Sequence, residues 1–224
     1  MERVSMDILG PFITSHNGNK YVVTISDEFT KWTEAIALPN QEASTIAVAF
    51  VHNFICRFGT PLQVHTDQGR NFESSLMKQM CDLFCIHKTR TTSYRPQSNG
   101  SVERMNRSLT KMLAAYCQSN QKQWDVYLPQ VMMAYRATEH STTAVSPNMM
   151  VLGRNVTLPS QAVIGRPDED EKESDVDKYV ADLQENRRRC HRIARENLKK
   201  QAKYRKKYYD SKAKSRRLEI NQPV

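Results

Sequence analysis

Apolar and polar residues alternate along the opening part of the chain. In the segment RVSMDIL (3–9), the apolar side chains share one face of an extended strand and Asp7 falls on the other. An Asn-Gly pair at 17–18 is typical of a tight hairpin turn, and two further strand-like segments follow at 20–27 and 31–38. The pattern predicts a three-stranded antiparallel meander.

The hydrophobic period then changes from two residues to that of a helix. Residues 41–59 predict a helix ending at Gly59, and residues 62–66 predict a short buried strand. The same reasoning predicts a helix over 72–84, a strand near 86–91, and helices over 101–118 and about 123–138. The expected fold class is therefore α/β, with a mixed five-stranded sheet flanked by helices.

The C-terminal part has a different pattern. No Gly or Pro occurs between positions 168 and 222, and the sequence predicts one long helix over about 175–215. Arg187 and Asn197 interrupt its apolar spacing, which argues against a sustained coiled coil.

The net charge of +9 is unevenly distributed. Residues 1–166 hold 16 basic and 12 acidic side chains, residues 168–177 hold seven acids and one lysine, and residues 187–217 hold 15 basic and two acidic side chains. A concentration of basic charge favours a polyanion as partner. Two interpretations of the basic stretch remain: contact with DNA, or a solvated helix used for packing or self-association.

Other classes of protein fit the sequence poorly. No run approaches 18 consecutive apolar residues, so we expect no membrane span, and the N-terminus lacks the apolar region of a secretory signal. Cys81 and Cys85 lie one helical turn apart, which could suit a metal, but no histidine pair accompanies them at finger-like spacing. The five cysteines are better interpreted as buried thiols in a reducing compartment.

Three acids occupy positions that a sheet could bring together. Asp7 lies within a strand, Asp67 ends a strand, and Glu103 lies on the polar stripe of a helix. Each has a simpler explanation: Asp7 could be solvated, Asp67 could form a turn, and Glu103 could pair with Arg107 at i,i+4. If packed together, three carboxylates would need cations to neutralise them, and Mg²⁺ characteristically binds carboxylates with substrate phosphates. Two such ions could clamp the attacking and leaving oxygens of a phosphoryl transfer.

Two longer stretches then point to a family. HTDQGRNF (65–72) and YRPQSNGSVERMNRSL (94–109) resemble the two signature stretches of retroviral and retrotransposon integrases, and 35 residues separate Asp67 from Glu103, as in that family's catalytic triad. MDILGP resembles the strand that carries the first aspartate, and SPNMMVLGR resembles the segment after the core in gypsy-type long-terminal-repeat elements.

The resemblance implies an RNase-H-like fold and a polynucleotidyl transferase. Asp7, Asp67 and Glu103 would bind two Mg²⁺ or Mn²⁺ ions. The enzyme would trim the 3′ ends of element DNA and join them to target DNA. The implied partners are double-stranded DNA and further copies of the chain in a homo-oligomer, without a membrane, and the implied place of action is the nucleus.

The resemblance also implies which residues contact DNA and how the chain is divided. Six residues would line the site and touch DNA: Tyr94, Gln97, Asn99, Asn106, Arg107 and Lys111. We expect a catalytic core over 1–166, an acidic linker over 167–177, and a basic helical tail over 178–224 leading toward a C-terminal barrel absent from this chain. Arg95 departs from the family pattern, in which a histidine usually precedes the proline, and the amino-terminal His/Cys zinc module is missing.

Two alternatives from other classes remain. The first is a domesticated, non-catalytic nucleic-acid-binding protein descended from such an element, against which the intact triad argues. The second is an RNase H, which shares the fold but uses a different set of acids and cuts RNA in hybrids.

Overall fold

The computed structural model describes residues 1–91, 100–118, 120–164 and 176–212. Its sheet has five strands in the order β3-β2-β1-β4-β5. The first three strands pair antiparallel, whereas β4 and β5 run parallel to β1. The strands are β1 (Arg3–Leu9), β2 (Tyr21–Asp27), β3 (Thr33–Leu38), β4 (Gln63–Thr66) and β5 (His87–Arg90). The predicted mixed sheet and its opening meander are confirmed.

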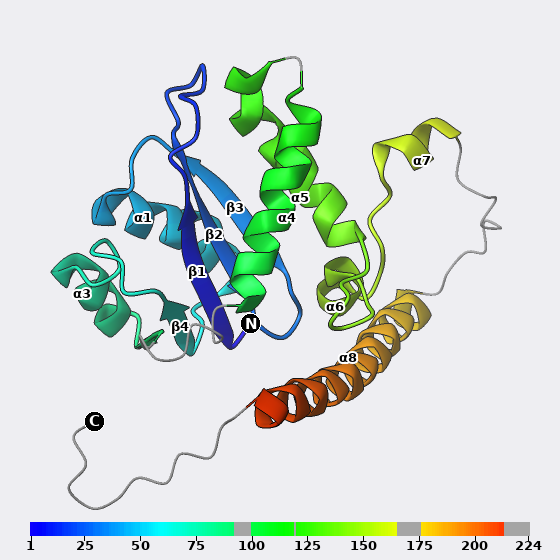
Figure 1. Ribbon diagram of the computed structural model, residues 1–224. Coiled ribbons are helices and arrows are strands. Elements are labelled where there is room, and N and C mark those ends of the chain that lie inside the picture. Colours follow the sequence, from blue (N-terminus) through cyan, green and yellow to red (C-terminus); the bar gives the residue numbers. More distant parts are fainter. Residues whose placement is uncertain (92–99, 119, 165–175, 213–224) are drawn as a thin grey trace, which may run out of the picture.

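Helices cover both faces of the sheet, with α1 and α3 on one side and α4 and α5 on the other (Figure 1). On the first face, Val4 and Met6 of β1 pack with Phe50. On the second face, Val22 of β2 packs with Leu109. These helices are α1 (Ala43–Phe50), α2 (Cys56–Phe58), α3 (Ser75–Leu83), α4 (Gly100–Tyr116) and α5 (Trp124–Ala137), with a π-helical turn at Val51–Ile55 and a 3₁₀ turn at Gln121–Gln123.

Two short helices were not predicted, α6 (Pro147–Leu152) and α7 (Pro159–Ile164). The start of α6 carries a sequence signal, because the Ser146 side chain accepts a hydrogen bond from the Met149 backbone N–H at 3.3 Å and Pro147 opens the first turn. Gly153 ends the helix in the left-handed conformation. Six residues are too few for a helical period to show in the sequence.

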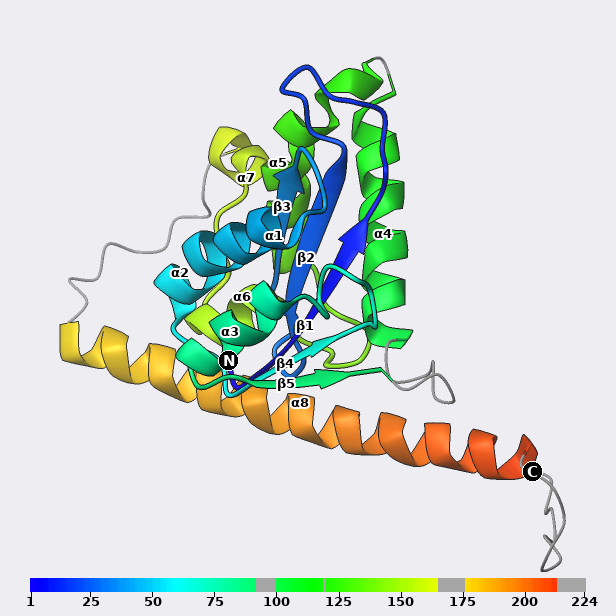
Figure 2. The same cartoon turned by 90° about the vertical axis from the view of Figure 1, so that its left-hand side faces the viewer.

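The long C-terminal helix is present as α8 (Val176–Lys212) and is anchored to α6. Cys190 and Ala194 are buried against Met150. A Cβ atom added at Gly153 would lie 2.5 Å from the Leu183 carbonyl oxygen, so only glycine allows this close approach. Both views show α8 passing below the end of the sheet where β1 begins (Figures 1 and 2).

The cysteines differ in their surroundings. Cys81, Cys117 and Cys190 are buried free thiols, as predicted, whereas Cys56 and Cys85 are exposed, so the prediction of a buried thiol is wrong for these two. Among the described helices, none is both long enough and apolar enough to cross a membrane.

Candidate active site

The three predicted acids lie on three neighbouring elements. Asp7 lies in β1, Asp67 directly follows β4, and Glu103 lies in the first turn of α4. The parallel pairing of β1 with β4 runs to Ser5 opposite His65. Asp7 and Asp67 each lie two residues beyond that pair, and the charge of Asp67 acts on the Asp7 carboxyl group.

The carboxyl group of Asp7 senses both other acids. Its pKa is raised mainly because the side chain is buried, and the negative charges of Asp67 and Glu103 raise it further. Two hydrogen bonds oppose this shift: the Ile8 backbone N–H donates to Asp7 Oδ1 at 2.9 Å, and Asn106 Nδ2 donates to Asp7 Oδ2 at 2.6 Å. The fold therefore brings three negative charges within electrostatic reach of one point.

Asp67 also forms the turn that its sequence neighbours suggested. Its Oδ1 atom accepts a hydrogen bond from the Gly69 backbone N–H at 2.9 Å. A Cβ atom added at Gly69 would itself lie 2.9 Å from that oxygen, so a larger residue there would displace the carboxylate. Asp67 can therefore form the turn and also belong to the candidate site, because the hydrogen bond of the turn orients its carboxylate.

Glu103 is exposed at the start of α4, where a negative charge is favourable to the helix dipole. No ion pair joins it to Arg107 among the described contacts, so the simple i,i+4 interpretation finds no support there. Within the described residues, no three His, Cys, Asp or Glu side chains form a group that could hold a metal ion as they stand. The three acids are thus close enough for their charges to interact, but their side chains do not form a complete set of metal ligands as they stand.

Asn106 supports Asp7 from the next turn of α4. It is only 7% exposed, and its Oδ1 atom accepts a hydrogen bond from Thr24 Oγ1 of β2 at 3.2 Å. We predicted that Asn106 contacts DNA, but its amide group is occupied by Asp7 and Thr24, which indicates a positioning role instead. Thr24 was missed because nothing in the sequence links it to a helix 82 residues away.

We expect Asn106→Ala to weaken strand cleavage by about 10–100-fold, the usual effect of removing a group that orients a metal ligand. The concentration of Mn²⁺ needed for half-maximal activity should also rise, because Asp7 would no longer be held in one orientation. A gel assay over a metal titration measures both effects. Thr110→Ala removes a hydrogen bond from the same helix and serves as the control. Wild-type activity and metal dependence in Asn106→Ala would contradict the positioning role.

The remaining predicted DNA contacts are in two groups. Tyr94, Gln97 and Asn99 lie outside the described residues. Arg107 and Lys111 are exposed on α4, and no described hydrogen bond or ion pair uses their side chains. Their contact with DNA stays a prediction.

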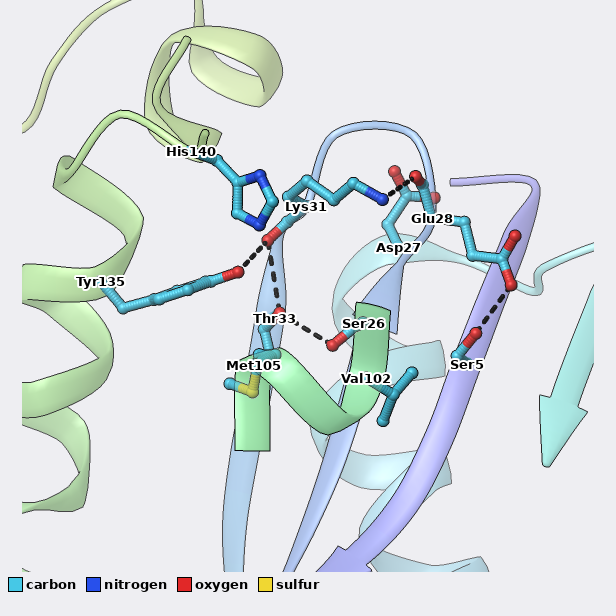
Figure 3. A pocket seen from close by; sticks show the side chains of 10 residues that line it. All are labelled: Ser5, Ser26, Asp27, Glu28, Lys31, Thr33, Val102, Met105, Tyr135 and His140. Atoms are coloured by element: carbon cyan, nitrogen blue, oxygen red, sulfur yellow. Dashed lines mark hydrogen bonds between the residues drawn. The ribbon is translucent and has the colours of Figure 1, made fainter. Parts of the chain in front are cut away.

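A small cavity of about 20 Å³ lies between the β2–β3 turn, α4 and the end of α5 (Figure 3). Lys31 crosses it, with Nζ donating to the Glu28 carbonyl oxygen at 2.7 Å, and the Tyr135 hydroxyl donates to the Lys31 carbonyl oxygen at 3.2 Å. His140 forms part of the wall, and burial, followed by the charges of Lys31 and Arg104, lowers its pKa to about 4.

This shift predicts a pH-dependent stability. The folded pKa of His140 is below its ordinary value of 6.5, so the unfolded chain binds the proton more readily. The stabilisation is complete above about pH 6.5 and is lost as the pH falls toward 4. Allowing for solvent screening, we expect about 1–2 kcal/mol less stability at pH 5 than at pH 7.

Urea unfolding of the wild type and His140→Asn at both pH values measures this difference, which should largely disappear in the variant. His16→Asn, at an exposed position, is the matched control and should keep the wild-type dependence. Equal pH dependence in His140→Asn and the wild type would contradict the prediction.

Comparisons with known proteins agree with the geometry. Residues 1–96 match the family described as "Integrase core domain". The whole chain is 29% identical over 223 residues to the retrovirus-related Pol polyprotein from transposon 412 of Drosophila melanogaster, covering 18% of that protein. It is 29% identical over 167 residues to gypsy retrotransposon integrase-like protein 1 of Bos taurus, covering 75% of this chain and 33% of that protein.

Solved structures show the same fold. The crystallised catalytic core domain of BIV integrase superposes with a TM-score of 0.55 at 25% identity, covering 68% of this chain and 94% of that one. This confirms the RNase-H-like fold expected from the resemblance. The chain spans a third or less of the length of the two curated relatives above. The chain is thus similar to the integrases of retroviruses and gypsy-type retrotransposons over most of its length, and its residues 1–96 match the integrase core domain.

Proposed function

We propose that this protein is a DNA integrase, a polynucleotidyl transferase that trims the 3′ ends of element DNA and joins them to target DNA. The observation that carries the proposal is the environment of Asp7, on which the charges of Asp67 and Glu103 both act. Similarity to the integrase core domain and to a retrotransposon Pol polyprotein supports the same assignment.

The donor set is suited to a hard divalent cation such as Mg²⁺ or Mn²⁺. Asp7 and Asp67 would bind it through carboxylate oxygens, and Glu103 would be the third ligand; one or two protein carboxylates with substrate phosphates are enough for Mg²⁺. Accumulated negative charge around Asp7 is what a cation would relieve. Two bound ions would supply activation of the attacking oxygen and stabilisation of the leaving one.

The chain's own residues hold these carboxylates ready. Asn106 and the Ile8 N–H fix both oxygens of Asp7, so its orientation does not depend on the ion. Gly69 fixes one oxygen of Asp67 and leaves Oδ2 without a described partner. Such fixed positions reduce the reorganisation needed when DNA binds.

Double-stranded DNA would be the substrate, and joining two ends at one target would require at least a dimer. We also propose that the protein acts in the nucleus, where its target DNA lies. A gel assay with Mn²⁺, comparing branched DNA with an RNA–DNA hybrid, tests the function. Cleavage and joining of DNA would support it. Activity on the hybrid alone would indicate an RNase H, and DNA binding without cleavage would indicate a domesticated protein.

A further inference from the structure

Two short strands, β4 and β5, lie side by side at one edge of the sheet, and Asp67 directly follows β4 (Figure 2). Their parallel pairing runs from Gln63 opposite His87 to Thr66 opposite Arg90. With only four residues in each strand, the main chain forms few hydrogen bonds, so contacts between side chains of the two strands contribute much of their mutual stability. These contacts therefore also decide how firmly Asp67 is held.

His65 of β4 is a buried polar side chain, only 5% exposed, with a threonine hydroxyl beside each of its ring nitrogens. Thr89 Oγ1 lies 3.0 Å from Nδ1, and Thr91 Oγ1 lies 3.4 Å from Nε2. Buried polar groups need such partners because water does not reach them. The imidazole ring thus links two hydroxyl groups that β5 and the residue directly after it supply.

The other partners of Thr89 lie in the first half of β4. Its Oγ1 atom accepts a hydrogen bond from Gln63 Nε2 at 2.9 Å and donates to the Val64 carbonyl oxygen at 3.3 Å. These residues come before His65 in the chain, on the side away from Asp67. Among the described contacts, Thr89 therefore joins the two strands without reaching this aspartate.

The partners of Thr91 lie on both sides of Asp67. On one side, the Thr91 backbone N–H and hydroxyl both donate to the Thr66 carbonyl oxygen, at 3.0 and 3.3 Å, and this oxygen belongs to the peptide group that joins Thr66 to Asp67. On the other side, Gln68 Nε2 donates to the Thr91 carbonyl oxygen at 2.7 Å. Thr66, which is 0% exposed, adds a hydrogen bond from its hydroxyl to the Asp67 carbonyl oxygen at 2.9 Å. Thr91 therefore holds the chain immediately before and after Asp67.

The direction of an aspartate carboxylate depends closely on its main chain, because the side chain has only two rotatable bonds. The Gly69 N–H already fixes one carboxylate oxygen of Asp67 within the turn. What remains is to fix the turn relative to the sheet, and the contacts of Thr91 do this. Groups that orient the ligands of a metal ion commonly change metal affinity by about 10–100-fold, although they do not touch the ion.

We propose that Thr91, held in place by His65, is a positioning residue for Asp67. It fixes the chain on both sides of this aspartate, so that the carboxylate keeps one direction before and after a divalent cation binds. The inference rests on the proposed function, in which Asp67 is a metal ligand, and adds to it the residues that orient this ligand from the neighbouring strand.

Mn²⁺ binding in the absence of DNA tests the proposal, with the wild type, Thr91→Val and Thr89→Val compared by isothermal titration calorimetry. Valine keeps the branched shape of threonine and removes the hydroxyl, so each variant loses one contact to the same imidazole ring. Thr91→Val should bind Mn²⁺ about 10-fold more weakly, whereas Thr89→Val should stay within about twofold of the wild type. Equal affinities for Mn²⁺ in the two variants would overturn the proposal.

Two measurements separate positioning from loss of fold. Thr91→Ser keeps the hydroxyl and should restore the Mn²⁺ affinity of the wild type. The midpoints of urea unfolding of Thr91→Val and Thr89→Val should fall by similar amounts, because each variant loses a hydroxyl that joins the strands. An Mn²⁺ affinity that follows the urea midpoint instead of the position of the lost hydroxyl would contradict the positioning role, as would weak binding by Thr91→Ser.

His65 provides a second matched pair of variants. The side-chain amide of Asn takes the place of Nδ1, beside Thr89, and that of Gln takes the place of Nε2, beside Thr91. His65→Gln should therefore keep the Mn²⁺ affinity of the wild type, whereas the affinity of His65→Asn should approach that of Thr91→Val. The reverse order, or equal affinities, would overturn the role assigned to His65.

DNA cleavage distinguishes a failure of this inference from a failure of the proposed function. In a gel assay with branched DNA, the Mn²⁺ concentration for half-maximal cleavage should rise in Thr91→Val, while DNA binding in chelator stays unchanged. Cleavage by the wild type with the same Mn²⁺ dependence in Thr91→Val and Thr89→Val would overturn this inference alone. Mn²⁺ binding that depends on Thr91, without any DNA cleavage by the wild type, would overturn the proposed function and leave the inference standing. No Mn²⁺ binding by the wild type, with or without DNA, would overturn both.

Discussion

Asp67→Asn is expected to abolish DNA cleavage and joining while leaving the fold intact. Asparagine has the same shape and can still accept the hydrogen bond from the Gly69 N–H, so the turn after β4 should persist. The variant loses the negative charge that a divalent cation requires. Bound metal contributes several kcal/mol to such a reaction, so we expect a loss of about 10²–10⁴-fold. A gel assay with Mn²⁺ and branched DNA measures it.

Asp82→Asn provides the matched control, because Asp82 is an exposed acid on α3, away from the site. It should retain wild-type activity, and DNA binding in chelator should survive in both variants. If Asp67→Asn cleaved DNA as fast as Asp82→Asn, the assignment of Asp67 as a metal ligand would be wrong. Activity of the wild type on an RNA–DNA hybrid alone would instead reject the integrase reaction itself.

Leu109→Ala should destabilise the protein by about 2–5 kcal/mol. Leu109 is 0% exposed and fixes the middle of α4 against the sheet. Truncation removes buried apolar surface and leaves a cavity that the neighbouring side chains fill only in part. Since α4 also carries Glu103 and Asn106, residual activity should fall at temperatures where the wild type is still stable. Urea unfolding at pH 7 gives the change in the free energy of unfolding.

Leu83→Ala makes the same chemical change at a position that is 78% exposed on α3. It should alter the free energy of unfolding by no more than about 0.5 kcal/mol. A similar loss in both variants would show that the contact of α4 with the sheet does not stabilise the core as its burial suggests.

The order of the longer helices and strands was predictable because each of them is long enough to show its period. The 3.6-residue period of α4 follows from its one buried face, and the alternation in β1 reflects Val4 and Met6 packing in the core beneath α1. The hairpin turn at 17–18 was likewise local, since an Asn-Gly pair needs no distant partner. The two short helices α6 and α7 were missed for the opposite reason.

The candidate site was predictable only as a set of residue types at a given spacing. Sequence could propose Asp7, Asp67 and Glu103, but the parallel pairing of β1 with β4 is what brings the segments that carry the first two side by side. It could not reveal that Asn106 is bonded to Asp7 rather than open to DNA, because that depends on how α4 crosses β1. Nor could it show that the charges of Asp67 and Glu103 raise the pKa of Asp7, although no three such side chains among the described residues form a group that could hold a metal ion.

The amino-acid sequence by itself therefore determined the longer helices and strands, through their short-range pattern, and the acids worth testing, through motifs that resemble those of integrases. Tertiary structure alone decided which side chains meet across the sheet and where α8 packs, including the burial of Cys190 and Ala194 against Met150. The reason is physical: local periodicity records which face is buried, whereas contacts between residues distant in sequence arise only when packing fixes the elements against one another.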